Sequence, residues 1–348
     1  MIEIDGSIGE GGGQVLRTSL ALAALLNKPL RIRNIRKNRS RPGLKPQHLA
    51  GVKALAAICR AGLEGAEIGS AELSLQPHSM EPGEYSFAIG TAGAATLLLQ
   101  TLLPVLIFAD APSSVRVSGG THVPWSPSFH YFNEIFLPML GRLGVHCRAT
   151  NRRCGFYPQG GGEITLEVEP VRILAPLFCS AVPPLSRITG MSGVARLPLS
   201  IAERQRSSAL KLLAGKQLAA EIALATVAAK SPGTFIFLKS EQGEWPAGFT
   251  GLGARGKSAE LVGQEAGQDL LQHLAAQACL DPHLADQLVV YLALAHGSSS
   301  FTTSRLSTHL LTNLQVVEQI LGCFCQVRGE VDKPGEVVIH GVGFPGRD

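Results

Sequence analysis

The sequence predicts an α/β fold in which a unit of strands and helices is repeated. Short strand-like segments alternate with helix-like ones, and this alternation recurs along the chain. Of the 348 residues, 45% are hydrophobic and 17% are charged, which is typical of a globular chain and not of a disordered one. This length is sufficient for two domains with a sizeable core.

The first 90 residues predict a β-α-β-α-β-β unit. Alternation indicates a strand over residues 1–5 and a second strand, with basic residues on one face, over residues 30–36. Helical spacing of apolar residues predicts helices over 14–26 and 46–59, and the second opens with a proline. Two more strands are expected within 71–77 and 85–90.

A similar order follows in the next 80 residues. We expect a helix with a glycine-rich entry over 91–106, a strand over 115–119, a helix over 130–144, and strands over 145–150 and 162–170. Near residue 187 the rhythm changes to a helical region over 207–227 and a strand over 234–239. This change predicts a domain inserted between about residues 180 and 272. Helices over 259–275, 285–295 and 308–321 and a strand over 335–340 close the chain.

Charge and cysteine content narrow the functional classes. The net charge is +4, but residues 31–45 contain seven basic side chains and no acidic one, which indicates either a solvated face or a phosphate-binding strip. The seven cysteines form no C-x-x-C pair, which argues against a zinc site and favours free thiols in a reducing cytoplasm. Neither a signal-peptide pattern nor an apolar run of membrane-spanning length is visible, so we expect a cytoplasmic protein without membrane contact.

The stretch GSIGEGGGQVLR (6–17) places three consecutive glycines before an expected helix. It does not match the dinucleotide fingerprint, because Gln14 stands where the last glycine would fall. Free N–H groups at a helix start favour an anion, and glycines allow its close approach. Glu10 beside a phosphate site indicates Mg²⁺ or Mn²⁺, or else a partner for the helix dipole. Arg17 would lie two turns away on the same face.

A second glycine-rich stretch, GLGARGKS (251–258), matches the phosphate-binding pattern G-x-x-x-x-G-K-S. A true loop of this kind directly follows a buried strand. The nearest expected strand ends about a dozen residues earlier, so the sequence disfavours a nucleotide site there.

His309 is the histidine with the most informative surroundings. It lies in LSTHLLTN, where Ser307 or Thr308 can cap a helix. The positive end of the helix dipole disfavours the charged imidazole, so His309 would be a neutral nucleophile, or else a capping residue. His48 begins a helix after the basic strip, and the HLADQ segment (283–287) could bind a nucleobase edge or cap a helix.

Seven stretches together resemble the RNA 3′-terminal phosphate cyclase family. They occur in the family's order over nearly the whole chain: DGSIGEGGGQVLR, IRKNRSRPGLKPQHL, GTAGAATLLLQTLLP, FADAPSSVRVSGGT, GFYPQGGG, HLADQ and THLLTN. The resemblance implies three β-α-β-α-β-β repeats packed around an axis, with a small α/β domain inserted in the third. The large domain would comprise residues 1–180 and 273–348, and the inserted domain residues 181–272.

The resemblance also implies an activity. Members convert an RNA 3′-terminal phosphate to a 2′,3′-cyclic phosphodiester with ATP, through a covalent histidyl-AMP and an RNA-3′-pp-5′-A intermediate. His309 matches the nucleophile. The metal, Mg²⁺ or Mn²⁺, would bind Glu10. Contacts to phosphate and the RNA end would come from Arg17, Arg36, Arg39 and Gln47. The nucleotide pocket would contain Gln100, Pro127, His283, Leu284, Ala285, Asp286 and Gln287.

Several alternatives stay open. His283 stands where a known family member has a tyrosine that stacks on adenine, so nucleotide selectivity is undecided. A homodimer is compatible with the family. The main alternative is a non-catalytic, cyclase-like factor in RNA processing or ribosome biogenesis, although such proteins lack the nucleophilic histidine. An enolpyruvyl transferase or a P-loop ATPase would need motifs that fit this sequence less well.

Overall fold

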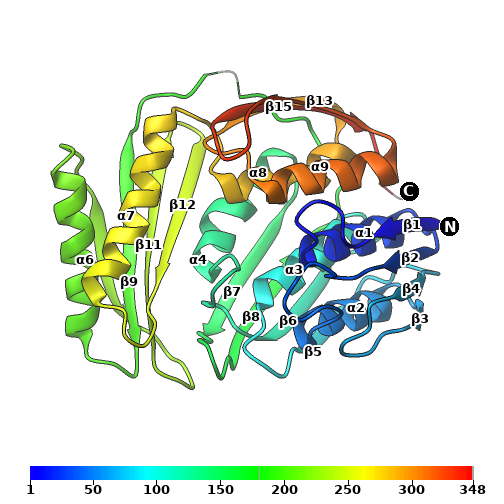
Figure 1. Ribbon diagram of the computed structural model, residues 1–348, viewed down its shortest axis with the longest axis horizontal. Coiled ribbons are helices and arrows are strands. Elements are labelled where there is room, and N and C mark those ends of the chain that lie inside the picture. Colours follow the sequence, from blue (N-terminus) through cyan, green and yellow to red (C-terminus); the bar gives the residue numbers. More distant parts are fainter. Residues whose placement is uncertain (180, 347–348) are drawn as a thin grey trace.

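The computed structural model describes residues 1–179 and 181–346 and contains four β-sheets with helices packed against them (Figure 1). The expected α/β class is confirmed. Helix α9 packs against α1 and α8, and α1 also packs against α3. One sheet with its two helices, coloured green to yellow, lies to one side of the other three (Figure 1).

The first sheet has the strand order β1-β2-β4-β3. Its strands are β1 (Ile2–Asp5), β2 (Leu30–Arg33), β3 (Gly62–Glu64) and β4 (Leu73–Gln76), and its helices are α1 (Gly13–Leu25) and α2 (Pro46–Ile58). Strand β1 runs parallel to β2, and β4 is antiparallel to β2. Alternate residues of β2 and β4 are buried, so one face of this sheet contributes to the core.

The second sheet has the order β5-β6-β8-β7. It contains β5 (Glu84–Ala88), β6 (Ser113–Gly119), β7 (Cys147–Arg153) and β8 (Gly162–Val168), with α3 (Ala95–Leu106) and a continuous helical stretch of α4 (Phe129–Tyr131), the π-helical turn η1 (Phe132–Phe136) and α5 (Leu137–Arg142). The expectation that residues 85–90 complete the first unit is wrong, because β5 pairs with β6. The three-residue β3 takes that place and is too short to show alternation.

The third sheet has the order β13-β15-β14. It comprises β13 (His296–Thr303), β14 (Phe324–Gly329) and β15 (Gly335–Val342), with α8 (Pro282–Leu294) and α9 (Thr308–Leu321). Phe178 forms a parallel bridge to Ser300 of β13. This bridge lies beside β13 at the position that β1 and β5 occupy beside β2 and β6 in the first two sheets. With that bridge included, the three sheets share one strand order, which is the order that repeated units would give.

The fourth sheet, β10-β9-β11-β12, has a core of its own. Its elements are β9 (Arg187–Ala195), α6 (Leu199–Ala214), β10 (Glu221–Thr226), β11 (Gly233–Gln242), β12 (Trp245–Leu252) and α7 (Ala259–Ala276). The expected boundary at residue 180 and the end of the chain at 348 lie outside the described residues, and residue 272 falls inside α7. The division into 1–180 with 273–348 and 181–272 therefore stays a prediction.

Two sequence-based expectations fail in this fourth sheet. The helical region expected over 207–227 ends at Ala214, and residues 221–226 form β10. The alanines and leucines of that segment fit either periodicity, which is why the pattern did not separate helix from strand. Gln217, with φ of 60° between the two elements, marks the break.

Strand β12 was also missed, and it directly precedes most of the GLGARGKS stretch. A strand therefore does precede this stretch, and the argument from the sequence against a phosphate loop there is wrong. A better reason is that Lys257 is already engaged: its Nζ donates to the Leu252 carbonyl, 3.0 Å away, and pairs with Glu265. Gly251 and Leu252 also belong to β12, which is antiparallel to β11. Within residues 1–179 and 181–346, no helix is both long enough and apolar enough to cross a bilayer.

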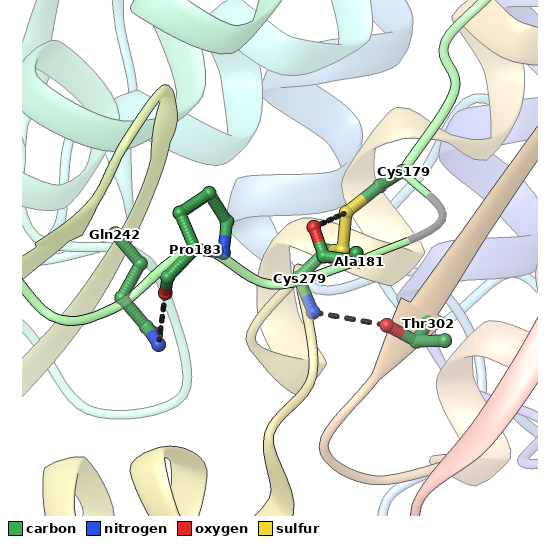
Figure 2. The surroundings of a disulfide bond; sticks show 6 residues. All are labelled: Cys179, Ala181, Pro183, Gln242, Cys279 and Thr302. Carbon is green, nitrogen blue, oxygen red and sulfur yellow. Dashed lines mark hydrogen bonds between the residues drawn. A yellow bond between two sulfur atoms is a disulfide. The ribbon is translucent and has the colours of Figure 1, made fainter.

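A disulfide joins Cys179 to Cys279, so the expectation that all seven cysteines are free thiols is wrong (Figure 2). Each cysteine is held beside β13 by its backbone N–H. Cys179 donates to the Ser300 carbonyl at 2.9 Å, and Cys279 donates to Thr302 Oγ1 at 3.0 Å. The disulfide thus ties together the two segments that lead into and out of the fourth sheet. The cytoplasmic location, which rested partly on free thiols, stays a prediction.

Reduction of this disulfide should destabilise the protein. A cross-link between residues 100 apart in sequence restricts the unfolded chain, and such links contribute about 2–4 kcal/mol. We expect a reductant to lower the thermal midpoint of the wild type and of Cys325→Ser, but not that of Cys279→Ser. With one disulfide, the unfolded but unreduced wild type should have five titratable thiols. A count of seven would contradict this expectation.

Candidate active site

The candidate nucleophile, His309, lies in the first turn of α9. The expected cap is confirmed, because Ser307 Oγ accepts a hydrogen bond from the Leu310 N–H at 3.1 Å. The His309 side chain is 48% exposed. Burial of the ring lowers the pKa of His309 from its usual value; nearby Arg17 and Arg39 act in the same direction, and Asp286 opposes them. The imidazole is therefore neutral at neutral pH.

Glu10 lies directly against this histidine. Its Oε2 is 2.7 Å from His309 Nε2, and its Oε1 pairs with the Arg39 guanidinium. The Glu10 backbone N–H donates to Thr312 Oγ1, one turn along α9, at 3.0 Å. Residues about 300 positions apart in sequence thus bring a neutral imidazole, a carboxylate and a guanidinium together.

The glycines of residues 6–13 are explained by the side chains around them. Gly9 and Gly11 have φ of 55° and 60°, which side-chain-bearing residues rarely adopt. A Cβ atom on Gly13 would lie 2.6 Å from His48 Nε2, and one on Gly12 would lie 2.9 Å from Glu10 Oε2. Gly12 and Gly13 therefore leave room for the charged and imidazole groups of the site, and Gly9 and Gly11 allow the positive φ angles of the loop.

Positive charge concentrates next to this loop. Arg17 donates from Nη2 to Gln14 Oε1 at 2.6 Å, and burial lowers the pKa of Arg17 to about 10. Burial, with the charges of Arg17 and Arg36, lowers the pKa of His48 to about 3, so His48 is neutral. Its Nδ1 accepts the Lys45 N–H at 3.2 Å. A half-buried guanidinium that donates to a neutral amide favours an incoming anion.

Two residues expected to contact the RNA end also hold loops. The buried Arg36 donates from Nη1 to the carbonyls of Arg41 and Gly43, at 2.7 and 3.0 Å, and so supports the basic strip from inside. Gln47 Oε1 accepts the Ala94 N–H at 3.0 Å, which joins α2 to the start of α3. Arg17, Gln47 and His48 line one small hollow between α1, α2 and α3.

The residues expected at the nucleotide come together only in part. Gln100 on α3 donates to Gln287 on α8 at 2.6 Å, and the Pro127 carbonyl accepts the Thr96 hydroxyl at 2.8 Å. His283 is exposed at the start of α8. By contrast, the side chains of Leu284 and Ala285 are fully buried in the main core.

The cap of α8 is Asp281, which the sequence analysis did not single out. Its Oδ1 accepts the N–H groups of His283 and Leu284, and both carboxylate oxygens accept the Tyr131 hydroxyl. Asp281, which precedes the HLADQ segment, therefore caps α8, and the residues of HLADQ do not. Asp286 is left inside the structure, where burial raises its pKa to about 6.

Three polar residues that the sequence analysis did not single out connect the site's helices. Thr18 Oγ1 on α1 donates to Asn313 Oδ1 at 2.6 Å, and Asn313 Nδ2 donates to the Asp286 carbonyl at 2.8 Å. Thr312, the third, holds the Glu10 backbone as described above. The signal was present in the sequence: positions 309, 312 and 313 are spaced to share one helix face.

A divalent cation fits one part of this site. Glu10 Oε2 is a buried carboxylate oxygen without a hydrogen-bond partner, because the close His309 contact lacks hydrogen-bond geometry. Within the described ranges, no cluster of three or more His, Cys, Asp or Glu could form a complete metal cage. Mg²⁺ usually takes one or two carboxylates and completes its shell with phosphate oxygens and water. Glu10 therefore fits a cation that arrives with a phosphate ligand.

Asp286 should make stability depend on pH. Because its folded-state pKa of about 6 exceeds the ordinary 3.8, the folded protein binds more protons between these values. Raising the pH from 4 to 6 should then lower the free energy of unfolding by about 2 kcal/mol through this group. Asp286→Asn should remove that decrease in urea titrations, and Asp110→Asn, at an exposed carboxylate, should not. An unchanged slope in Asp286→Asn would contradict the assignment.

Known proteins of one family resemble this chain over nearly its whole length. A family model described as RNA 3′-terminal phosphate cyclase matches residues 8–327. Proteins of that name are 41% identical in Pyrobaculum aerophilum, covering 99% of both chains, and 43% identical in Methylococcus capsulatus, covering 98% of this chain and 97% of the other.

Two further comparisons differ in strength. A cyclase of Hyperthermus butylicus is 44% identical over 92% of each chain. The enolpyruvyl transferase NikO of Streptomyces tendae aligns with 99% of this chain and 49% of its own, at 16% identity and a TM-score of 0.42, a likeness too low to indicate a shared activity. With a matching family model over nearly its whole length and relatives above 40% identity, the chain belongs to the RNA 3′-terminal phosphate cyclase family.

Proposed function

We propose that this protein converts an RNA 3′-terminal phosphate to a 2′,3′-cyclic phosphodiester at the expense of ATP. The observation that carries the proposal is the contact of His309 Nε2 with Glu10 Oε2 at 2.7 Å, in a chain that belongs to the cyclase family. A non-catalytic relative would have no need of a neutral imidazole at the entrance of a basic, glycine-lined site.

In the first step, the lone pair of His309 Nε2 attacks the α-phosphorus of ATP. A P–N bond forms, the bond to the bridging oxygen breaks, and pyrophosphate leaves with that electron pair. The lowered pKa of His309 supports this role, because only the neutral ring is a nucleophile. Arg17 and Arg39 would stabilise the negative charge that develops on the phosphate oxygens.

In the second step, an oxygen of the RNA 3′-phosphate attacks the same phosphorus. The P–N bond breaks, His309 is released, and the RNA end becomes an RNA-3′-pp-5′-A anhydride. The adjacent 2′-oxygen then attacks the 3′-phosphorus and AMP leaves, which closes the cyclic phosphodiester. Because the nucleophile is already tethered to the electrophile, this last step gains from proximity.

Glu10 would hold the divalent cation, Mg²⁺ or Mn²⁺, which when bound supplies charge neutralisation to the phosphates. The Gln100–Gln287 pair and Asp286 would surround the nucleotide, with exposed His283 beside them. Leu284 and Ala285 could contribute only through their backbone. The homodimer and the cytoplasmic location stay predictions.

Replacement of His309 should abolish covalent labelling. With [α-³²P]ATP and Mg²⁺ or Mn²⁺, we expect the wild type to acquire an acid-labile, base-stable label that survives a denaturing gel, as a phosphoramidate does. His309→Ala should acquire none. His78→Ala, which removes an exposed histidine, is the matched control and should be labelled like the wild type. A label that persists in His309→Ala would mean a different nucleophile, and an unlabelled wild type would contradict the enzymatic proposal.

The Thr312 hydroxyl should be needed to position Glu10 against His309. Thr312→Val keeps the shape but leaves the Glu10 N–H without its acceptor, whereas Thr312→Ser keeps the hydroxyl. Since an unsatisfied buried donor costs about 1–3 kcal/mol, we expect self-adenylylation of Thr312→Val to slow by about tenfold. Thr312→Ser should stay near the wild-type rate. Equal rates for the Val and Ser variants would refute this role.

A further inference from the structure

Trp125 combines a strained backbone with an almost complete lack of packing. Its φ is 64°, in the left-handed region that bulky residues avoid, and it is 99% exposed. Neither feature stabilises the fold, because the indole is not buried against the protein. Strain and exposure at one aromatic residue point to contact with a ligand outside the chain.

A second exposed aromatic residue lies in a loop alongside. Tyr157 is 72% exposed, and its neighbour Phe156 forms a parallel bridge with His122. The N–H groups of Thr121 and His122 both donate to the Gly155 carbonyl, at 2.9 and 3.1 Å. The segments that carry Trp125 and Tyr157 are therefore paired through their backbones.

Basic residues from two connections of the fourth sheet and from β7 of the second sheet flank the Tyr157 loop. The Lys230 side chain packs over Gly161, where a Cβ atom would lie 2.8 Å from Lys230 Cδ. Arg196 donates from Nη1 to the Lys230 carbonyl at 2.8 Å, and both residues are exposed. Arg153 donates from Nε to the Gly161 carbonyl at 2.7 Å. Exposed rings thus lie beside positive charge.

The same two segments meet the start of α3, next to the candidate active site. A Cβ atom on Gly160 would lie 2.8 Å from the Thr91 carbonyl oxygen, which shows how closely the Tyr157 loop packs there. The Ala94 N–H donates to Gln47, and the Thr96 hydroxyl donates to the Pro127 carbonyl, two residues after Trp125. A chain bound with its end near Gln47 could therefore continue over this surface.

We propose that Trp125 and Tyr157 form a stacking platform for bases of single-stranded RNA that lie 5′ to the reacting end. Arg196 and Lys230 contact the phosphates between those bases. Aromatic rings beside basic side chains are the usual combination for binding single strands, because every base has a face that stacks. This inference rests on the proposed function, since it takes the RNA end to be bound near Gln47.

Intrinsic fluorescence offers a direct test, because the chain contains only two tryptophans. Trp245 is 7% exposed and lies under the Arg142 guanidinium, 4.7 Å from its ring centroid. An eight-nucleotide RNA with a 3′-phosphate should quench the emission of the wild type. Trp125→Phe should show little quenching and still bind the RNA, because phenylalanine retains a stacking ring.

Kinetics test the same platform without a spectroscopic probe. Trp125→Ala and Tyr157→Ala should each raise the KM for the eight-nucleotide substrate by about tenfold, the usual effect of losing one base stack. The KM for a dinucleotide 3′-phosphate and the rate of self-adenylylation should not change. Phe324→Ala removes a ring that is 57% exposed on β14 of the third sheet, and serves as the matched control.

The outcomes separate this inference from the proposed function. A wild type that is adenylylated, but whose variants show the same KM for long and short RNA, would overturn the platform and leave the reaction intact. Emission that stays unquenched on saturation with RNA would also overturn the platform. The exposed rings would then be assigned to contact with a protein partner. A wild type that forms no adenylate would instead remove the proposed function.

Discussion

The arrangement of the site depends on one face of α9. That face carries His309 and Thr312, which contact the carboxylate and the backbone N–H of Glu10. It also carries Asn313, which contacts the Thr18 hydroxyl and the Asp286 carbonyl. These polar contacts lie where α1, α8 and α9 pack together, so apolar burial around them fixes the distances between them. A nucleophile on a rigid helix can be held in register with a carboxylate from the opposite end of the sequence only through such contacts.

The sequence singled out the central residues of the candidate site more readily than the residues that hold them in place. The glycines, Glu10, Arg17 and His309 were identifiable because each residue type has a distinct role near phosphate, and their spacing placed them at helix starts. Thr18 was not, because a hydroxyl inside a helix has many possible partners, and Asn313 was indicated only by its spacing from His309. Arg36 illustrates the same limit: its position in a basic strip suggested contact with an anion, and nothing in the sequence indicated that its Nη1 also donates to the Arg41 and Gly43 carbonyls.

The fold was predictable where periodicity was long and failed where strands were short or ambiguous. Helices α1, α2, α3 and α9 were found within one to four residues of their ends, since each has a continuous apolar face. Strand β3 has three residues, and β13 is rich in serine and threonine, so neither shows a strong pattern. Pairing between distant strands, such as β5 with β6, depends on contacts that no local pattern encodes.

The disulfide between Cys179 and Cys279 gives the fourth sheet a topological property. The chain leaves the third sheet at Phe178, which bridges Ser300, and returns at Leu280, which bridges Thr303 of the same strand. The intervening stretch is therefore a covalently closed ring attached at one place. Proteolytic cleavage anywhere inside that ring would leave a single molecule, which would separate on a gel only after reduction. Since its ends are neighbours on β13, the ring is also the part of the chain that evolution could exchange for a short turn with least disturbance to the strands beside it.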